Sequence, residues 1–342
     1  MTRATGCRGC KHSEVRIGIV SFAHMHAYSY ARAVRSIPGA ILAGITDDSE
    51  ERGLAASREF EAPYYRSIGD LLVTDIDAVI ICSENALHKE HVLAAAAAGK
   101  HVLCEKPIAT TLDDASVMVN ECRDKGVELG IAFPVRHAPP VVRAKQLIDE
   151  GKIGRIIAVS ATNHGRMPGG WFIDRALSGG GAVLDHTVHV ADLLRWFLAD
   201  EARRVYAEVD TRMHDIAIDD CGTLSIEFEK GVFATLDPSW SRPKAYPTWG
   251  DVTMEIVGTS GVVSLDVFAQ VLVHASDARN AVLYRPWGDD MDLALVTDFV
   301  ESVREGRSPA ASGFDGMRAL EIALAAYESA RRGEPVELSH PI

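Results

Sequence analysis

The sequence has no apolar run long enough to cross a membrane and no excess of positive charge. A membrane helix needs roughly 18 to 20 apolar residues, and no run in the 342 residues approaches that length. Lysine and arginine number 35 against 48 aspartate and glutamate, a formal net charge of −13. No basic stripe is interleaved with aromatic residues, so nucleic acid and membrane surfaces are not expected partners. Met1–Ser13 lacks the apolar stretch of a signal peptide, and we expect a cytoplasmic protein.

The sequence also lacks a disulfide framework. Its six cysteines have no regular spacing, and Cys82, Cys104 and Cys122 fall in or beside predicted core elements. Such a pattern is typical of reduced, packed thiols.

The sequence also lacks the ligand spacing of a zinc site. Cys7 and Cys10, with His12 nearby, have no second ligand pair at zinc spacing. We therefore expect no metal, since other candidates would need the fold to bring together His24, His26, His186 and His189.

The first part of the chain alternates short apolar runs with helical periodicities. Helices are predicted over Ala86–Ala98 and Leu112–Lys125, the second with Thr111 as N-cap. Strict alternation of strand and helix predicts an α/β Rossmann domain with a parallel, doubly wound sheet. We assign residues 1–14 to a flexible extension and 15–135 to this NAD-binding domain. The predicted strands are Val15–Val20, Ile41–Thr46, Ala78–Cys82, Val102–Cys104 and Val127–Ala132.

From residue 136 to 342 the pattern changes to that of an α+β domain. After a helix over Pro140–Glu150, seven segments between residues 155 and 274 alternate inward and outward residues, as antiparallel strands of one large open sheet do. Further helices are predicted over Gly181–Ala199, Asp290–Glu305 and Asp315–Arg332.

The first strand leads into a turn where a dinucleotide phosphate would bind. The turn reads Ser21-Phe22-Ala23-His24-Met25, and glycines are absent near Ser21 and Ala23. Serine and alanine are the smallest substitutes, and the helix N-terminus still offers free N–H groups. We expect cofactor binding to be retained, although a decayed nucleotide site is the alternative.

An acidic pair ends the second predicted strand. Asp47 lies where a carboxylate binds the adenosine ribose hydroxyls, and Asp48 beside it would repel a 2′-phosphate. NAD is therefore favoured over NADP. The same pair could instead serve only as a helix N-cap.

Two segments carry the expected chemistry. Cys104-Glu105-Lys106-Pro107 places a lysine at the carboxyl end of a parallel strand, where it can donate hydrogen bonds to an oxygen that gains negative charge. After Gly179-Gly180-Gly181, Asp185 and His189 are spaced i, i+4 on one helix face, so the carboxylate can orient an acid/base imidazole. We expect the glycines to let the chain lie close to a ligand. An ordinary polar helix face is the alternative.

Substrate contacts are less defined. The segment 240–249 carries rings and cations suited to a sugar or an acid group, and a packed linker explains it equally well. Trp171 and Phe172 could close over the site or belong to the core. Arg136 is a further candidate to face the cofactor or substrate.

The chain resembles the glucose-fructose oxidoreductase and inositol dehydrogenase family (Gfo/Idh/MocA). The resemblance covers nearly everything from Val15 onward and rests on residues 77–81, 85–88, 98–107 and 153–156, and on the glycine triplet with Asp185 and His189. It implies NAD-dependent hydride transfer at a hydroxyl or keto group of a sugar, inositol or polyol, and a homodimer or homotetramer through the C-terminal sheet.

The resemblance also implies roles for individual residues. Lys106 would hold the reacting oxygen, His189 would act as acid/base supported by Asp185, and Asp47 would bind ribose. The glycine-poor turn departs from the family pattern, as does Glu84, where a proline is common. Two alternatives stay open: an enzyme with tightly bound NAD that uses transient oxidation for epimerisation, elimination or glycoside cleavage, and a non-catalytic sensor. The expected cofactor contacts are Gly18, Ser21, Phe22, Ala23, His24, Met25, Asp47, Asp48, Ser83, Asn85, His88, Glu105, Lys106 and Arg136.

Overall fold

The computed structural model describes residues 14–286 and 289–338 and begins with a parallel sheet. Six strands in the order β3-β2-β1-β4-β5-β6 all pair in parallel, which confirms the predicted Rossmann domain. The two-residue strand β3 was not predicted, because so short an element carries no periodicity. The strands are β1 (Val15–Val20), β2 (Ala40–Thr46), β3 (Tyr64–Tyr65), β4 (Ala78–Ile81), β5 (His101–Glu105) and β6 (Leu129–Ala132).

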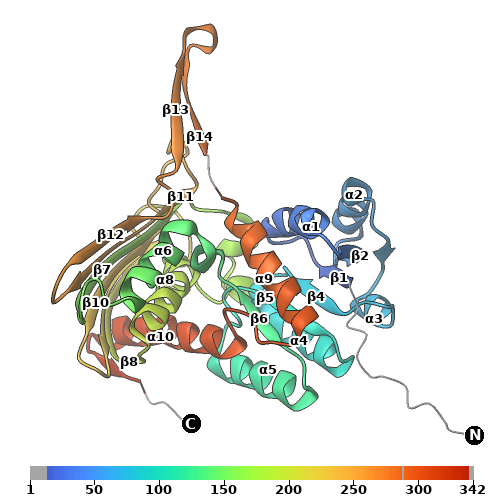
Figure 1. Cartoon of the computed structure of the whole chain (residues 1–342), viewed down its shortest axis with the longest axis horizontal. Helices are drawn as coiled ribbons and strands as arrows, with labels where there is room; N and C mark the ends of the chain where they lie inside the picture. Colours follow the sequence, from blue (N-terminus) through green and yellow to red (C-terminus); the bar gives the residue numbers. More distant parts are fainter. Residues whose placement is uncertain (1–13, 287–288, 339–342) are drawn as a thin grey trace, which may run out of the picture.

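Helices cover both faces of this sheet (Figure 1). Along β4, Ile80 packs in one buried cluster with α1 and α9, while Val79 and Ile81 face the cluster that includes α4 and α5. Helix α9 comes from near the C-terminus, so a late segment completes the core of the first domain. The helices are α1 (His26–Ser36), α2 (Glu50–Phe60), α3 (Ile68–Leu72), α4 (His88–Ala97), α5 (Leu112–Lys125) and α9 (Met291–Glu305).

The second domain is built on a seven-stranded sheet in the order β12-β11-β7-β10-β9-β8-β15. Most neighbours are antiparallel, as predicted, but β10 pairs with β7 in parallel. In the sequence β8 and β9 come between β7 and β10. The chain runs along β8, reverses along β9 and reverses again along β10, which therefore lies beside β7 and points in the same direction. The strands are β7 (Ile156–Gly165), β8 (Ala202–Asp210), β9 (Cys221–Phe228), β10 (Phe233–Ser239), β11 (Gly250–Gly258), β12 (Val262–Asp266) and β15 (Val336–Glu337).

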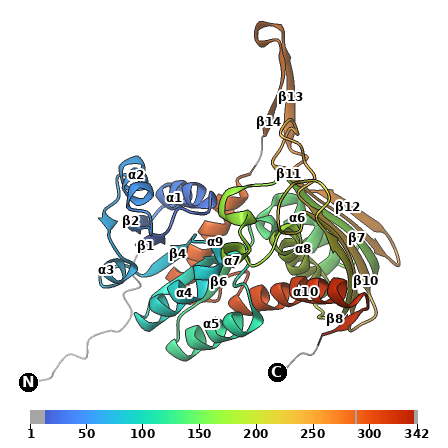
Figure 2. The same cartoon turned by 180° about the vertical axis from the view of Figure 1, so that it is seen from behind.

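The two faces of this sheet differ. Helices α6 (Pro139–Asp149), α8 (Ala182–Leu198) and α10 (Gly313–Arg332) pack on its inner side, toward the first domain (Figures 1 and 2). The outer side exposes Ile157, Phe233 and Val262. An unpredicted strand, β14 (Ala281–Pro286), pairs with β13 (Val271–Ser276) in a hairpin that projects from the body (Figure 2). Within the described ranges, every helix is too short or too polar to span a bilayer.

Candidate active site

The catalytic lysine predicted from sequence joins the two domains. Lys106 follows β5 directly, and its Nζ contacts Oδ1 of Asp185 in the first turn of α8. The two side chains are only 6% and 14% exposed. His88 supports this corner because its Nδ1 lies 2.9 Å from the Pro107 carbonyl oxygen and its Nε2 lies 3.2 Å from the Ser83 carbonyl oxygen. The fold therefore places Lys106 and Asp185, two of the predicted site residues, in direct contact.

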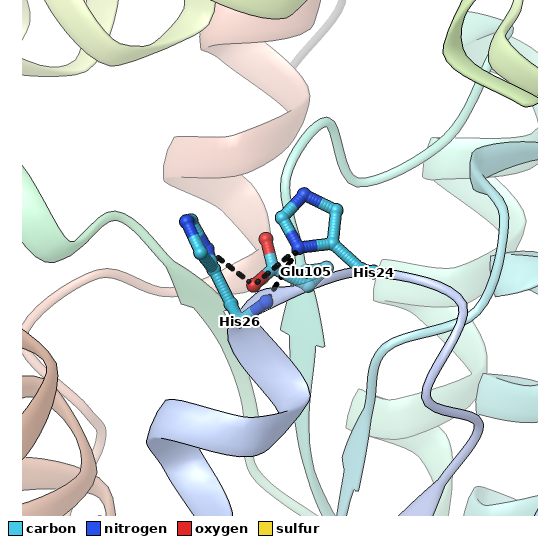
Figure 3. A group of neighbouring side chains, drawn as sticks. All are labelled: His24, His26 and Glu105. Atoms are coloured by element: carbon cyan, nitrogen blue, oxygen red, sulfur yellow. Dashed lines mark hydrogen bonds and ion pairs between the residues drawn. The ribbon is translucent and has the colours of Figure 1, made fainter. Parts of the chain in front are cut away.

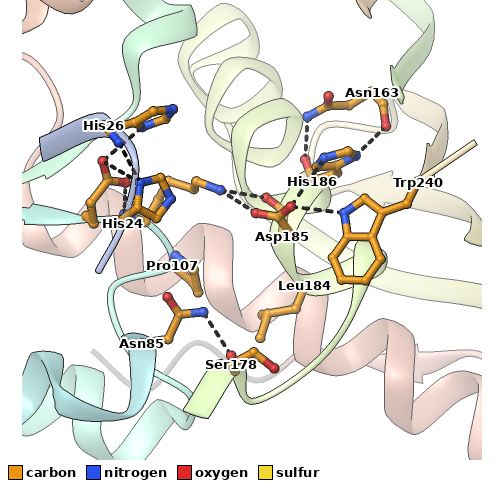
Figure 4. Close-up of polar contacts among 12 residues, drawn as sticks. His24, His26, Asn85, Pro107, Asn163, Ser178, Leu184, Asp185, His186 and Trp240 are labelled. Carbon is orange, nitrogen blue, oxygen red and sulfur yellow. Dashed lines mark hydrogen bonds and ion pairs between the residues drawn. The ribbon is translucent and has the colours of Figure 1, made fainter. Parts of the chain in front are cut away.

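The Asp185 carboxylate has three side-chain partners (Figure 4). Besides Lys106, Trp240 Nε1 donates a 3.1 Å hydrogen bond to Oδ2, and His186 Nε2 lies 3.3 Å from the same oxygen. Burial alone would raise the pKa of Asp185, but the charges of Lys106 and His186 lower it below its usual value. The carboxylate is therefore ionised, and it orients Lys106 and His186. Sequence spacing had assigned this orienting role toward His189.

Two histidines of α8 occupy different environments. His186 Nδ1 lies 2.9 Å from the Asn163 carbonyl oxygen, and Asn163 Nδ2 donates a 3.0 Å bond to the His186 carbonyl. His189 is 8% exposed, and its Nδ1 is buried without a hydrogen-bond partner among the described residues. Burial, followed by the charge of Lys106, lowers the pKa of His189 well below its usual value. A neutral imidazole at pH 7 can accept a proton.

Lys106, Asp185, His186 and His189 border one pocket of about 170 Å³ between the domains. The opposite wall comes from the large sheet and includes His164, Asp251 and Trp249. Trp249 belongs to the segment that sequence analysis had connected with substrate, and Trp240, from the same segment, contacts Asp185. The arrangement places an ammonium group, a carboxylate and a neutral imidazole around one space.

A charged cluster on the pocket wall was not predicted. His164 Nδ1 lies 2.9 Å from Asp251 Oδ1, and its Nε2 lies 3.2 Å from Asp237 Oδ2. Burial would lower the pKa of His164, but these two carboxylates raise it to about 9. Arg242 Nε donates to Asp251 at 2.7 Å. Because these residues belong to β7, β10 and β11 or follow them, only the strand register reveals the cluster; the one local signal was Asn163-His164 at the end of a predicted strand.

The glycine-poor turn keeps an unusual backbone conformation. Ser21 has φ 69°, in the left-handed region that favours glycine. The Phe22 N–H donates a 2.7 Å bond to Asp47 Oδ2, and the Ala23 N–H donates to Ser21 Oγ at 3.1 Å. Asp47 is also held by Arg52, whose Nε and Nη2 lie 2.8 and 2.7 Å from its two oxygens. A buried carboxylate thus fixes the turn beside the N-terminus of α1, an arrangement that fits a dinucleotide.

A segment of the second domain lies over this turn. Trp171, in the short helix η3 (Gly170–Ile173), donates from Nε1 to the Ala23 carbonyl at 3.1 Å and stacks on Phe172 at 3.9 Å between ring centroids. The Phe172 ring is also 5.3 Å from the His24 ring. These aromatic residues therefore contact the predicted cofactor turn rather than lying in a core away from it.

Several other predicted cofactor contacts also have partners within the protein. A Cβ at Gly18 would lie 2.9 Å from a Leu71 methyl carbon, so packing requires this glycine. Arg136 forms a buried ion pair with Asp192 and donates to the Ala310 carbonyl. Ser83 Oγ lies 3.0 Å from His91 Nδ1. Their roles toward a cofactor stay predictions.

The remaining residues of that set divide into two buried ones, Asn85 and Glu105, and two exposed ones, Met25 and Asp48. Asn85 Nδ2 donates to the Ser178 carbonyl at 2.8 Å, and its Oδ1 is buried with no partner in the described part of the chain. Met25 and Asp48 are exposed at the edge of the turn. Glu105, the last residue of β5, lies beside His24 and His26.

The glycine triplet has a packing role within the protein, and the expected approach to a ligand stays a prediction. A Cβ at Gly181 would lie 1.9 Å from the Asp219 carbonyl oxygen, and one at Gly180 would lie 2.4 Å from the Tyr327 hydroxyl. The Asp219 carboxylate accepts from the Gly181 and Val183 N–H groups at 2.9 and 2.8 Å. The triplet therefore allows a distant aspartate to cap α8, which carries Asp185.

A Rossmann domain whose fifth strand is followed directly by a lysine that lines an interdomain pocket is typical of one class, the nucleotide-dependent oxidoreductases. Residues 15–133 match the family described as "Oxidoreductase family, NAD-binding Rossmann fold", and residues 141–264 match "GFO/IDH/MocA C-terminal domain". The chain belongs to the Gfo/Idh/MocA oxidoreductase family, which confirms the resemblance seen in the sequence.

Similar proteins match over almost the full chain. A 1,5-anhydro-D-fructose reductase of Ensifer adhaerens is 32% identical over 316 residues, covering 90% of this chain and 93% of that protein. A myo-inositol 2-dehydrogenase of Thermotoga maritima is 28% identical and covers 96% and 100%. The crystal structure of a myo-inositol 2-dehydrogenase from Lactobacillus plantarum has a TM-score of 0.83 at 25% identity, with coverage of 95% and 100%.

Proposed function

We propose that the protein transfers a hydride between a nicotinamide dinucleotide and a secondary hydroxyl or keto group of a sugar, inositol or related polyol. The observation that carries the proposal is the contact between Lys106 and Asp185 at a pocket that also contains the neutral imidazole of His189. Relatives named for anhydrofructose reduction and inositol oxidation support the substrate class.

Each catalytic side chain has a role that follows from its charge. The Lys106 ammonium donates a hydrogen bond to the reacting oxygen and stabilises the negative charge that develops on it. His189 accepts the hydroxyl proton during oxidation and returns it during reduction. Asp185 keeps the ammonium oriented. The dinucleotide supplies the hydride acceptor or donor.

For the cofactor, NAD is favoured over NADP. The turn 21–25 and the N-terminus of α1 would hold the diphosphate, and Asp47 would lie beside the adenosine ribose. Asp48 is exposed next to it, so its carboxylate would repel a 2′-phosphate. Arg52 moderates this preference because it neutralises Asp47.

On the opposite pocket wall, His164, Asp251 and Trp249 would bind the parts of the substrate that do not react. The Asp251 carboxylate, which His164 Nδ1 contacts at 2.9 Å, offers an acceptor for a substrate hydroxyl group, and the Trp249 ring offers a face for sugar C–H groups.

A cofactor titration followed by turnover measurements tests this function. Quenching or enhancement of fluorescence should report tighter binding of NADH than of NADPH. A panel of polyols and sugars should then give a change in nicotinamide absorbance that Lys106→Ala reduces by about 10² or more. Lys152→Ala is the control, because that side chain is 62% exposed. Binding of neither dinucleotide would contradict the proposal, as would unchanged turnover in the Lys106 variant.

We further propose that the outer face of the large sheet mediates a homodimer or homotetramer. Ile157, Phe233 and Val262 are 41%, 51% and 56% exposed and project from neighbouring parts of one sheet. Light scattering coupled to gel filtration should give a mass above that of the 37.0 kDa chain. Phe233→Glu should lower it, whereas Val73→Glu, at an 85% exposed site in the other domain, should not. A monomeric wild type would contradict this proposal.

A further inference from the structure

A cluster of three side chains that can bind a metal lies at the N-terminus of α1 (Figure 3). His24 comes from the turn, His26 is the first residue of α1, and Glu105 is the last residue of β5. We propose that His24, His26 and Glu105 bind a divalent transition-metal ion of the Zn²⁺ class. His24 belongs to the turn that is proposed to hold the diphosphate, so metal binding is measured without dinucleotide and its outcome is separate from that of the turnover test.

The spacing of the donor atoms matches a first-row ion. Oε1 of Glu105 lies 2.9 Å from His26 Nδ1 and 3.7 Å from His24 Nδ1, and one donor atom from each residue lies within 4.8 Å of the others. Bonds of about 2.0 to 2.2 Å in tetrahedral geometry separate ligand atoms by roughly 3.3 to 3.5 Å. Only small side-chain shifts are needed for the three donor atoms to reach these separations. Two imidazoles and one carboxylate form the donor set of catalytic zinc sites, with one position left open.

The His24 nitrogen nearest the carboxylate carries no proton. His24 Nδ1 accepts a 3.2 Å hydrogen bond from the His26 backbone N–H, so it is the unprotonated nitrogen of the ring. It lies 3.7 Å from Glu105 Oε1 in a site where His24 is 3% and Glu105 0% exposed. An unprotonated imidazole nitrogen and a carboxylate oxygen are both ligand atoms for Zn²⁺.

Glu105 is fully buried, and its nearest cationic partner is His26, because the ammonium of Lys106 contacts Asp185 instead. His26 Nδ1 lies 2.9 Å from Glu105 Oε1, and the carboxylate can only accept, so a proton of His26 lies between the two atoms. A divalent ion would take the place of that proton and leave the Lys106–Asp185 pair intact.

Surrounding groups already orient the carboxylate for such a role. The Lys106 backbone N–H donates to Glu105 Oε2 at 3.1 Å, which leaves Oε1 directed to the two imidazoles. The buried Tyr30 hydroxyl lies 3.3 Å from His26 Nδ1 and hydrogen-bonds to Glu105. Hydrogen bonds of this kind hold ligands in place at metal sites. The open coordination position would face the pocket, because His24 and His26 line it together with Lys106.

The test is metal binding by the full-length, untagged protein. After treatment with a chelator, the protein is titrated with Zn²⁺ against a chromophoric chelator and with Co²⁺ while visible absorbance is recorded. We expect one equivalent per chain and, with Co²⁺, absorption bands typical of nitrogen and oxygen ligands. His26→Gln and Glu105→Gln should each weaken binding by roughly 100-fold.

Two controls make the result specific. His214→Gln replaces an imidazole that matches His26 in exposure, at 28% against 29%, and that also pairs with a carboxylate. This variant should bind Zn²⁺ with wild-type affinity. The double variant Cys7→Ser/Cys10→Ser removes the other possible metal site noted in the sequence, which lies outside the described residues. It should still bind one metal equivalent per chain.

Three results would overturn the proposal: no stoichiometric binding by the wild type, wild-type affinity in both cluster variants, or loss of the ion only in the cysteine variant. Circular dichroism and melting temperature check the fold of each variant. If one cluster variant fails to fold, the other and His24→Gln provide the same comparison.

Discussion

The indole Nε1 of Trp240 donates a 3.1 Å hydrogen bond to Oδ2 of Asp185, while Lys106 contacts Oδ1 of the same carboxylate. Trp240 is 1% exposed and directly follows β10, so the large sheet itself restricts rotation of the carboxylate. A residue outside the reacting groups thereby fixes where the Lys106 ammonium is held.

Trp240→Phe tests this relationship. The ring volume is partly kept but the N–H donor is lost, so the carboxylate should gain rotational freedom and kcat should fall about tenfold with a smaller change in KM. Steady-state kinetics on an accepted polyol measure both. Trp249→Phe, at a 46% exposed position on the pocket wall, should affect KM more than kcat. An unchanged kcat in Trp240→Phe would mean that the hydrogen bond does not position Asp185.

The two histidines of α8 should differ in their effect on the reaction. His189→Asn removes the neutral imidazole whose Nδ1 has no partner among the described residues, and kcat should fall by about 10² to 10⁴. His186→Asn removes a group that contacts Asp185 and the Asn163 carbonyl, and we expect a loss of about tenfold. The reverse order would identify His186 as the acid/base group.

The pH dependence of oxidation follows from the environment of His189. Burial, followed by the charge of Lys106, lowers its pKa below the usual 6.5. A general base acts when unprotonated, so kcat/KM should be constant just above pH 6.5 and fall as pH decreases through the His189 pKa. Initial rates in overlapping buffers between pH 4.5 and 8, about the range over which histidine titrates, give the profile. An acidic limb centred above pH 6.5 would exclude His189 in this role.

Sequence analysis was most successful where a pattern is local. The helix over Leu112–Lys125 and its Thr111 cap match the structure, because capping and periodicity are properties of one segment. Lys106 and Asp185 were identified because each belongs to a distinctive short motif. The parallel pairing of β10 with β7 was not predicted, since register between distant strands leaves no local trace.

Contacts between distant segments account for what the sequence did not show. Glu105 could not be grouped with His24 and His26 before the end of β5 was placed beside the first turn of α1. The partners of His164 likewise come from β10 and β11. The packing reason for the glycine triplet was not predicted because Asp219 and Tyr327, which occupy the space beside it, are remote in the sequence.

Gly181→Ala tests the role of the triplet in stability. The added Cβ would lie 1.9 Å from the Asp219 carbonyl oxygen, so the cap of α8 must move, and the free energy of unfolding should fall by at least about 2 kcal/mol. Denaturant unfolding measures the difference. Gly69→Ala is the control: its Cβ would meet only Ser67 Oγ at 3.7 Å within α3, so it should be neutral or slightly stabilising. Equal stability of the two variants would contradict the packing argument.

The stability contributed by His164 should depend on pH with a defined sign. Its pKa is raised to about 9 by Asp237 and Asp251, against an unfolded value of 6.5. The contribution is therefore fully present below pH 6.5 and is lost as pH rises through 9. The difference in free energy of unfolding between wild type and His164→Gln should be greatest near pH 6 and shrink by on the order of 2 to 3 kcal/mol by pH 10. A difference that grows over this interval would mean that His164 is not held protonated by the two carboxylates.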